Sequence, residues 1–273
     1  MAELRAALAI AAKDLRQFRR YPLGFVSWIF TSLYQGVIPA FLFGAAFAVG
    51  TRVVGLERTV GTADLVGFIF IGGIVGGLIV TAFWGVAFSF RSEMEQGTLE
   101  PSWLTPTRHE TLVLGRALGS LLPFALVQLV LLTIGVAFFG LHLSASTLLA
   151  LPALALALVA MAGVSYALAA VVLLIKTADM FVDTTQFLFS TASGTAFPIT
   201  MLPLAFQPIA LLLPTTYAID ILRQQAIGQR PLFDPTIEYA ALVVLTLALY
   251  PAGQWVFGRA DRHLRRTGGL AQY

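Results

Sequence analysis

Long apolar segments alternate with short polar ones along this chain. Five windows contain no Asp, Glu, Lys or Arg: 21–51, 65–90, 117–175, 184–219 and 239–258. A helix needs about 20 apolar residues to cross a hydrocarbon core of about 30 Å, and every window reaches that length. The pattern therefore predicts an all-α integral membrane protein.

The third window has room for two helices. Turn-forming and polar residues between Gly140 and Ser146 interrupt it, and such clusters mark connections between regular segments. The sequence thus predicts six transmembrane helices, at 25–49, 65–90, 115–138, 147–174, 182–204 and 237–257.

Composition supports the membrane assignment and excludes some kinds of chemistry. Hydrophobic residues make up 58% of the 273 residues and charged residues only 11%, whereas about a quarter of a soluble domain is charged. A soluble protein of this composition would expose too much apolar surface. The chain has no cysteine, which excludes disulfides and cysteine-ligated metal sites.

The distribution of positive charge predicts the orientation. With six spans, thirteen of the 17 Lys and Arg residues fall on the side that holds both termini and the polar segment 91–116. Positive residues concentrate in cytoplasmic loops. We therefore expect a multi-pass protein of the cell inner (cytoplasmic) membrane with both termini in the cytoplasm.

Residues 1–20 are expected to form an amphipathic helix on the cytoplasmic membrane surface. Its apolar residues recur at three- and four-residue spacing: Leu4, Leu8, Ala11, Leu15 and Phe18. Basic residues on its other faces favour anionic headgroups, although the same charges could serve only to fix topology. Residues 21–258 then form the transmembrane domain, and 259–273 form a basic cytoplasmic tail.

A cleavable signal peptide is a competing interpretation of the first span. Residues 46–48 have the small-x-small pattern of a cleavage site. The apolar region before them is longer than the usual 7–15 residues (roughly), and a second span follows directly. We therefore expect the first span to be retained.

The second span contains two overlapping Gly-x-x-x-Gly pairs, formed by Gly72, Gly73, Gly76 and Gly77. No strand precedes them and no Lys-Ser/Thr follows, so the pattern is not that of a phosphate-binding loop. Glycines at this spacing let another helix approach closely. We expect a packing contact there, within the chain or across a dimer.

Segment 198–236 is too apolar for an ordinary loop and too rich in proline for one helix. Irregular backbone at membrane depth survives only when it is buried in protein or lines a cavity, and proline interrupts a helix. We expect the fifth span to end near Pro198–Pro203 and short re-entrant helices to follow in the outer leaflet. Asp220, Arg223 and Arg230 would mark the return to outer water.

The polar segment 91–116 carries three arginines, one histidine and four glutamates between apolar windows. Gly97 is expected to end the second helix, and Thr107–Glu110 fits a capping box that starts the third. The connector between them keeps apolar residues among its charges. A polar turn needs only a few residues and stays open as an alternative, but this mixture is typical of a docking surface.

Two patterns in the chain resemble the type-2 ABC exporter permeases, the membrane subunits of transporters for drugs, lipids and polysaccharides. The first is Glu93-Met-Glu-Gln-Gly97-Thr-Leu-Glu100, then Leu104-Thr-Pro-Thr-Arg108 and Gly115-Arg116. The second is Phe197-Pro198, Leu202-Pro203 and Pro214-Thr-Thr-Tyr217-Ala-Ile-Asp220-Ile-Leu-Arg223. The resemblance covers nearly the whole chain in span number and spacing. Pro101 departs from the family, which more often continues a short helix at that point.

The resemblance implies that the connector is a coupling helix seated in a groove of a separate ATPase. The candidate residues of this coupling segment (91–110) are Glu93, Glu95, Gly97, Thr98, Leu99, Glu100, Trp103 and Arg108. The re-entrant segment would form an outer gate, with Pro198, Pro203, Pro214, Tyr217, Asp220 and Arg223. Residues 1–20 would correspond to the interfacial connecting helix of the family.

The chain has no Walker pattern, so it cannot hydrolyse ATP by itself. Carriers driven by ion gradients keep ionisable residues inside their spans, and the central turns of the six expected spans lack them. Asp179 and Asp183 are expected near the cytoplasmic junction, solvated or paired with Lys176. A gradient-driven carrier or channel stays open as the alternative function.

A membrane-embedded lipid-modifying enzyme is a further, less favoured alternative. The three histidines cannot form a set, because His109 and His263 are expected in the cytoplasm and His142 outside. We therefore expect no catalytic residue, cofactor site or metal site in this chain.

The sequence is best explained as the permease subunit of an ATP-driven exporter. ATP and Mg would be bound by two copies of a partner ATPase subunit, and a second permease subunit would complete a homodimer or similar heterodimer. Membrane lipids are expected partners and nucleic acid is not. The uncharged, Phe-rich spans favour an amphipathic or lipid-like substrate such as a drug, a lipid or a lipid-linked glycan, and export follows from the resemblance alone.

Overall fold

The computed structural model describes residues 2–20, 22–33, 38, 42, 54–105, 107–175 and 178–267. Within these ranges every regular element is a helix. In chain order they are α1 (Ala2–Arg20), α2 (Pro22–Ser32), α4 (Val54–Val60), α5 (Leu65–Glu95), α6 (Leu99–Trp103), α7 (His109–Phe139), η2 (Ala145–Ala150), α8 (Leu151–Leu174), α9 (Asp179–Ala192), η3 (Ile199–Met201), α10 (Gln207–Leu211), α11 (Pro214–Ile227) and α12 (Pro235–Thr267).

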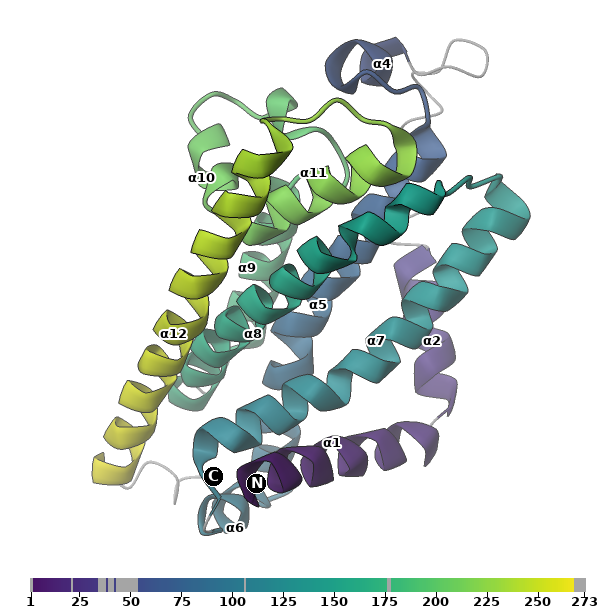
Figure 1. Cartoon of the computed structure of the whole chain (residues 1–273). Coiled ribbons are helices and arrows are strands. Elements are labelled where there is room, and N and C mark those ends of the chain that lie inside the picture. The colour runs from purple at the N-terminus through teal and green to yellow at the C-terminus, as the bar shows by residue number, and fades with distance from the viewer. Residues whose placement is uncertain are drawn as a thin grey trace.

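Four helices of the described residues are long and apolar enough to cross a membrane. They are Leu65–Glu95, His109–Phe139, Ala145–Leu174 and Pro235–Arg266. Figure 1 shows them running between two opposite ends, one with α1 and α6 and the other with α4, α10 and α11. We call these the α6 end and the α11 end. The four helices match four of the six expected spans.

The other two expected spans are not seen as single long helices. Most of 25–49 lies outside the described residues, apart from α2 and two single positions. The expected span 182–204 is wrong as one helix, because α9 ends at Ala192 and Gly194 follows with a φ of 81°. A 14-residue helix is about 21 Å long, shorter than a hydrocarbon core of about 30 Å.

The tightest packing joins α12 to α8 along much of their length. A Cβ atom at Gly253 would overlap the carbonyl oxygen of Gly163, and one at Gly163 would meet the carbonyl oxygen of Leu249 at 2.5 Å. The two backbones therefore touch directly, which only residues without a side chain allow.

Helix α1 lies across the α6 end, against the first part of α7 (Figure 1). Ala7 is fully buried there, and a Cβ atom at Gly115 would meet Cβ of Ile10 at 2.8 Å. Leu4 and Leu8 remain 60% and 54% exposed. The contact with α7 therefore uses Ala7 and Ile10, which lie outside the predicted stripe, whereas Leu4 and Leu8 of the stripe stay exposed.

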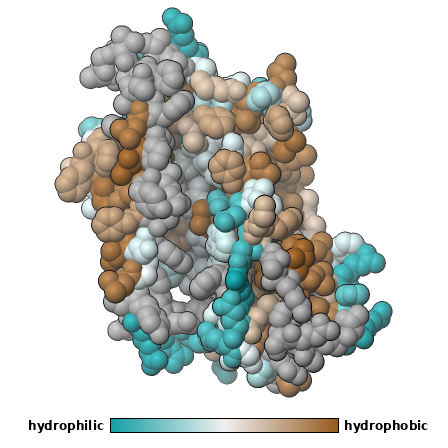
Figure 2. Space-filling model, turned by 180° about the vertical axis from the view of Figure 1, so that it is seen from behind, coloured by the Kyte–Doolittle hydropathy of each residue, from teal (hydrophilic) through white to brown (hydrophobic). Residues whose placement is uncertain are grey.

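The surface agrees with a membrane environment. Figure 2 shows hydrophobic side chains over much of one face, with hydrophilic ones gathered mainly toward the α6 end. Long apolar side chains on α7 and α12 are exposed, among them Leu129, Phe138, Leu247 and Trp255. Lipid tails would cover such a surface without the cost of hydrating it.

Candidate functional site

Helix α5 ends in a tight glycine turn at the start of the polar segment. Gly97 has a φ of 65°, a conformation that costs glycine little and other residues more. The Thr98 N–H donates to the carbonyl of Glu93 at 2.9 Å, and the Gly97 N–H donates to that of Met94 at 3.1 Å. This pair of bonds is the Schellman motif. Gly97 therefore ends the second helix as the sequence predicts.

A short helix, α6, follows this turn despite Pro101. Pro101 is the third residue of α6, where a backbone N–H has no partner within the helix, so its absence costs little. The Ser102 N–H and hydroxyl both donate to the carbonyl of Thr98, at 3.2 and 2.9 Å. The departure from the family pattern at this position therefore does not prevent the short helix.

The inner side of α6 is apolar and buried. Leu99 and Trp103 belong to the main hydrophobic cluster of the chain, and the Trp103 ring meets the Phe90 ring edge-on at 5.6 Å between centroids. The Trp103 indole donates to Oδ1 of Asp261, near the end of α12, at 3.0 Å. Both residues were expected at a docking surface, but their side chains face the rest of the chain.

His109, the first residue of α7, joins Trp103 and Asp261 in one cluster. Its Nδ1 lies 2.7 Å from Oδ1 of Asp261, and its Nε2 lies 3.2 Å from the carbonyl oxygen of Trp103. Arg265 donates from Nη2 to the other oxygen of Asp261 at 2.8 Å. We call Trp103, His109, Asp261 and Arg265 the α6–α12 clasp.

The clasp holds its carboxylate in the charged form. Burial alone raises the pKa of Asp261, but hydrogen bonds from Arg265, Trp103 and His109 outweigh it and lower the pKa below its ordinary value. Hydrogen bonds to the charged form stabilise that form. Asp261 therefore remains an anion that can hold all three partners.

The capping box expected at Thr107–Glu110 is wrong. The N-cap of α7 is Arg108, which makes no side-chain cap bond. A capping box needs Glu at the third helical position, and the observed start at His109 puts Glu110 at the second. The His109 contacts in the clasp fix the beginning of α7 instead.

Glu93 forms a buried ion-pair centre between three helices. Its carboxylate pairs with Arg116 of α7 and accepts from Nζ of Lys13 of α1 at 3.1 Å. The Arg116 guanidinium also lies over the Phe90 ring, 3.8 Å from its centroid. This predicted coupling residue thus holds α1, α5 and α7 together inside the chain.

Four other predicted coupling residues are exposed: Glu95, Gly97, Thr98 and Arg108. Pro101 and Leu104 of the same segment are exposed as well. Leu104 is 80% exposed, and the side chain of Glu100 is not among those described. Arg91 accompanies them, pairing with Glu95 at 2.8 Å and with Asp179 of α9. Asp179 was expected to be solvated or paired with Lys176, and Lys176 lies outside the described residues.

The glycines of the second span have different surroundings. A Cβ atom at Gly72 would overlap the carbonyl oxygen of Thr195, and one at Gly77 would overlap the Gln128 amide. Gly76 has ordinary space beside Thr195, and nothing lies within 4 Å of a Cβ at Gly73. The close contacts join α5 to α7 and to the turn after α9, whereas Gly73 faces outward.

The predicted outer-gate residues lie around α11. Pro214 is the first residue of this helix, where its missing N–H costs nothing, and the Tyr217 hydroxyl donates to the carbonyl of Leu211 at 2.9 Å. Pro198 precedes η3 and is buried, and Pro203 is exposed. The segment contains the short elements η3, α10 and α11. Whether they enter the outer leaflet remains a prediction.

Arg223 is a buried cation that holds three segments at this end. It is 2% exposed and its guanidinium donates to the carbonyls of Phe68 at 3.0 Å, Gly194 at 2.9 Å and Thr195 at 2.8 Å. It also lies 3.3 Å from the centroid of the Phe68 ring. Arg223 thus joins α11 to α5 and to the end of α9.

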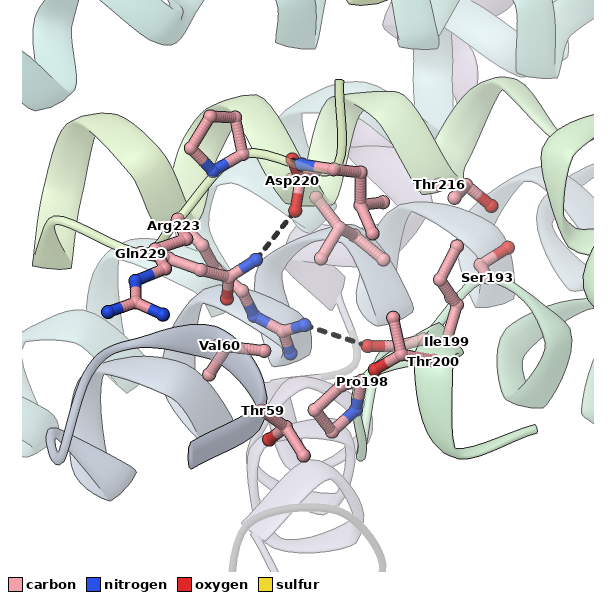
Figure 3. Close-up of a pocket in the computed structure, with 15 residues that line it drawn as sticks. Thr59, Val60, Ser193, Pro198, Ile199, Thr200, Thr216, Asp220, Arg223 and Gln229 are labelled. Carbon is pink, nitrogen blue, oxygen red and sulfur yellow. Dashed lines mark hydrogen bonds between the residues drawn. The ribbon is translucent and has the colours of Figure 1, made fainter. Parts of the chain in front are cut away.

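A pocket of about 250 Å³ lies beside Arg223. Figure 3 shows Arg223 and Asp220 near its centre, with Val60 of α4 and Pro198 on the walls. Asp220 accepts from the Gln229 amide at 2.6 Å. The sequence placed Asp220 and Arg223 where the chain regains outer water, but both side chains are buried.

Sequence reasoning missed the residues that hold these sites together. The sequence predicts His109 only as a cytoplasmic residue of the capping box, and Asp261 as part of a basic tail. Their positions are 152 residues apart, so no local spacing signals the contact. The one sequence signal was Trp103 and Leu99, apolar residues that needed a buried partner.

Comparison with known families agrees with this arrangement. The family model for the ABC-2 type transporter matches residues 5–226, from α1 almost to the end of α11. No curated protein matches the chain. The matched region covers the long apolar helices α5, α7 and α8, the polar segment with α6 and most of the proline-rich segment before α12. The chain therefore belongs to the ABC-2 type transporter family and is a multi-pass membrane permease.

Proposed function

We propose that this chain is the transmembrane subunit of an ATP-driven exporter, powered by a separate ABC ATPase. Two ATPase copies would serve a homodimer, or a heterodimer with a similar permease, in the cytoplasmic membrane. The α6 end would face the cytoplasm, as the distribution of positive charge predicts. ATP and Mg would be bound by the ATPase.

The observation that carries the proposal is the division of the coupling segment into two sides. Its inner side is fixed by buried Leu99, Trp103 and the clasp, while Leu104, Arg108 and Glu95 of the same segment are exposed. An exposed apolar residue among charges, on a rigid support, is typical of a docking surface. A mere connecting turn would have no need of this buried support.

The spans favour an amphipathic or lipid-like substrate, such as a drug, a lipid or a lipid-linked glycan. Most of the described membrane helices present Leu, Val, Phe and Ala, and such a lining would bind apolar chains with little discrimination. Export rather than import rests on the likeness to exporter permeases.

Binding to an ATPase tests the proposal without a known substrate. The wild-type chain in lipid nanodiscs is mixed with purified ABC ATPase subunits from the same organism, and affinity and ATP hydrolysis are measured. We expect Leu104→Glu with Arg108→Glu to weaken binding about tenfold or more, as for residues central to an interface. Stimulation of ATP hydrolysis should fall in parallel.

A matched control reverses a charge at the other end. Arg58 of α4 is exposed at the α11 end, and Arg58→Glu should leave ATPase affinity unchanged. The proposal fails if the wild-type chain binds no ATPase, or if the Leu104/Arg108 variant binds as tightly as the wild type.

A further inference from the structure

Helix α12 has a cluster of buried hydrogen bonds at each of its ends. At the α6 end, Asp261 accepts from Trp103 of α6 at 3.0 Å and lies 2.7 Å from Nδ1 of His109. These are the partners that fix the inner side of the coupling segment. α6 and α12 are far apart in sequence. The clasp connects them directly through side-chain hydrogen bonds.

At the α11 end, Glu238 is fully buried and holds α12 to α11. It accepts from the Gln224 amide at 2.6 Å and from the Phe233 N–H at 3.0 Å. The same Gln224 nitrogen donates to Asp220 at 2.8 Å, and Asp220 also accepts from the Leu232 N–H at 2.9 Å. The first turn of α12 is therefore bonded to α11 and to the loop before α12.

One unbroken helix joins the two clusters. α12 has 33 residues, and at 1.5 Å per residue the clusters lie about 35 Å apart along its axis. Backbone contact at Gly163 and Gly253 ties α12 to α8 between them. Such a braced helix transmits displacement better than a loop of the same length.

We propose that Asp261 is a positioning residue that couples α6 to α12, so that ATPase-driven movement of α6 reaches α11 through α12. This inference rests on the proposed function, because it takes the ATPase as the source of movement. If α6 shifts, the end of α12 must follow or several buried polar groups lose their partners. Leaving such groups unpaired costs about 1–3 kcal/mol each.

The route through α12 differs from the routes through α5 and α7. α5 precedes α6 and α7 follows it, each after a short connection. Both helices would therefore move with α6 in any case. α12 is linked to α6 through side-chain contacts, among them the hydrogen bonds of Asp261, so a substitution at Asp261 can weaken this link. Spatial continuity alone does not establish energetic coupling, and the inference therefore needs a measurement at the distant end of α12.

A reporter at Ile237 supplies that measurement. Ile237 lies in the first turn of α12 and is 57% exposed, and the chain has no native cysteine. Ile237→Cys is labelled with an environment-sensitive fluorophore and reconstituted in nanodiscs with the ATPase. The change in emission on adding ATP is recorded for each permease variant.

Asp261→Asn is the central variant, because it keeps the shape but removes the negative charge and one acceptor. The variants are compared at saturating ATPase, and we expect the ATP-dependent change at residue 237 to fall by about fivefold or more, the range of typical coupling. Asp261→Glu should restore most of the change. A merely structural role would lower thermal stability without reducing the response of folded complexes.

Two further variants keep the test falsifiable. Trp103→Phe removes the indole N–H that bonds Asp261, together with one ring of a buried side chain, and it replaces Asp261→Asn if that variant does not insert. Asp183→Asn neutralises an exposed acid on α9 and should leave the response unchanged.

The outcomes separate this inference from the proposed function. No ATPase binding by the wild type overturns the proposed function. Binding with a full ATP-dependent change in Asp261→Asn or Trp103→Phe overturns the inference and leaves the proposed function standing. Loss of ATPase binding in folded Asp261→Asn also overturns it, because Asp261 would then act on docking and not on transmission.

Discussion

Gly163 of α8 and Gly253 of α12 touch backbone to backbone, in the middle of the most extensive helix pair of the chain. A Cβ atom at Gly253 would overlap the Gly163 carbonyl oxygen and meet Cα of Gly163 at 3.0 Å. The atoms that would clash with this Cβ belong to the backbone of Gly163, which cannot change rotamer as a side chain can. The separation of α8 and α12 therefore depends on these two glycines.

Gly253→Ala should destabilise the protein by about 1–3 kcal/mol, the usual cost of overpacking a well-packed contact. Thermal unfolding in detergent measures this. Gly73→Ala is the matched control, because nothing lies within 4 Å of its Cβ position and alanine favours a helix by up to about 1 kcal/mol. Equal melting temperatures for Gly253→Ala and the wild type would show that α8 and α12 can separate freely.

Neighbouring acids at the end of α5 should differ sharply in their importance. Glu93 is buried against Arg116 and Lys13, whereas Glu95 is exposed and pairs with exposed Arg91. Breaking a buried pair costs about 3–5 kcal/mol, and an exposed pair contributes at most about 1 kcal/mol. Glu93→Gln should therefore lower the melting temperature far more than Glu95→Gln.

The same pair of variants tests what holds α1 in place. In Glu93→Gln, Arg116 loses its anion and Lys13 loses its link to α5, so proteolysis within residues 2–20 should accelerate. Equal proteolysis of both variants would mean that Ala7 and Ile10 hold α1 without the ion pair.

The sequence predicts the long apolar helices well, because membrane spans follow from local composition. It also predicts the glycine turn at Gly97, since a left-handed residue after a helix is a local requirement. The helix start at His109 was missed because a distant residue, Asp261, overrides the local capping pattern. The burial of Glu93 and Arg223 was missed for the same reason, since each charge is satisfied by groups far away in sequence.

Stability should depend on the Asp261 carboxylate at low pH. The hydrogen bonds from Arg265, Trp103 and His109 lower its pKa in the folded protein. A lowered carboxyl pKa stabilises the fold above the unfolded value of about 3.9 and loses that contribution as the pH falls through the folded pKa. Wild type should therefore be more stable than Asp261→Asn at neutral pH, and the difference should shrink in strong acid.

Melting temperatures of both proteins across an acid series provide the check. Arg265→Gln is the companion variant, because it removes one cation from the Asp261 carboxylate. In this variant the acid-induced loss of stability should begin at a higher pH than in the wild type. A difference between wild type and Asp261→Asn that is constant across the series would contradict a charged Asp261.

Arg223 should be important for the α11 end because it bonds the backbone of two other segments. Its guanidinium meets the carbonyls of Gly194 and Thr195 just after α9, and that of Phe68 in α5. Lysine keeps the charge but cannot reach three carbonyls with a planar fork. Arg223→Lys should lose about 1.5–3 kcal/mol for each charged hydrogen bond that is not replaced.

Hydrogen exchange localises this effect, since global melting does not. In Arg223→Lys, amides of residues 193–200 should exchange faster, while those in the middle of α8 and α12 should keep their protection, because two of the freed carbonyls, those of Gly194 and Thr195, belong to this local turn. Arg58→Gln, at an exposed position on nearby α4, should leave both regions unchanged. Unchanged protection at 193–200 in Arg223→Lys would mean that the turn after α9 is held by Gly194 and its neighbours alone, and that Arg223 serves the pocket rather than the fold.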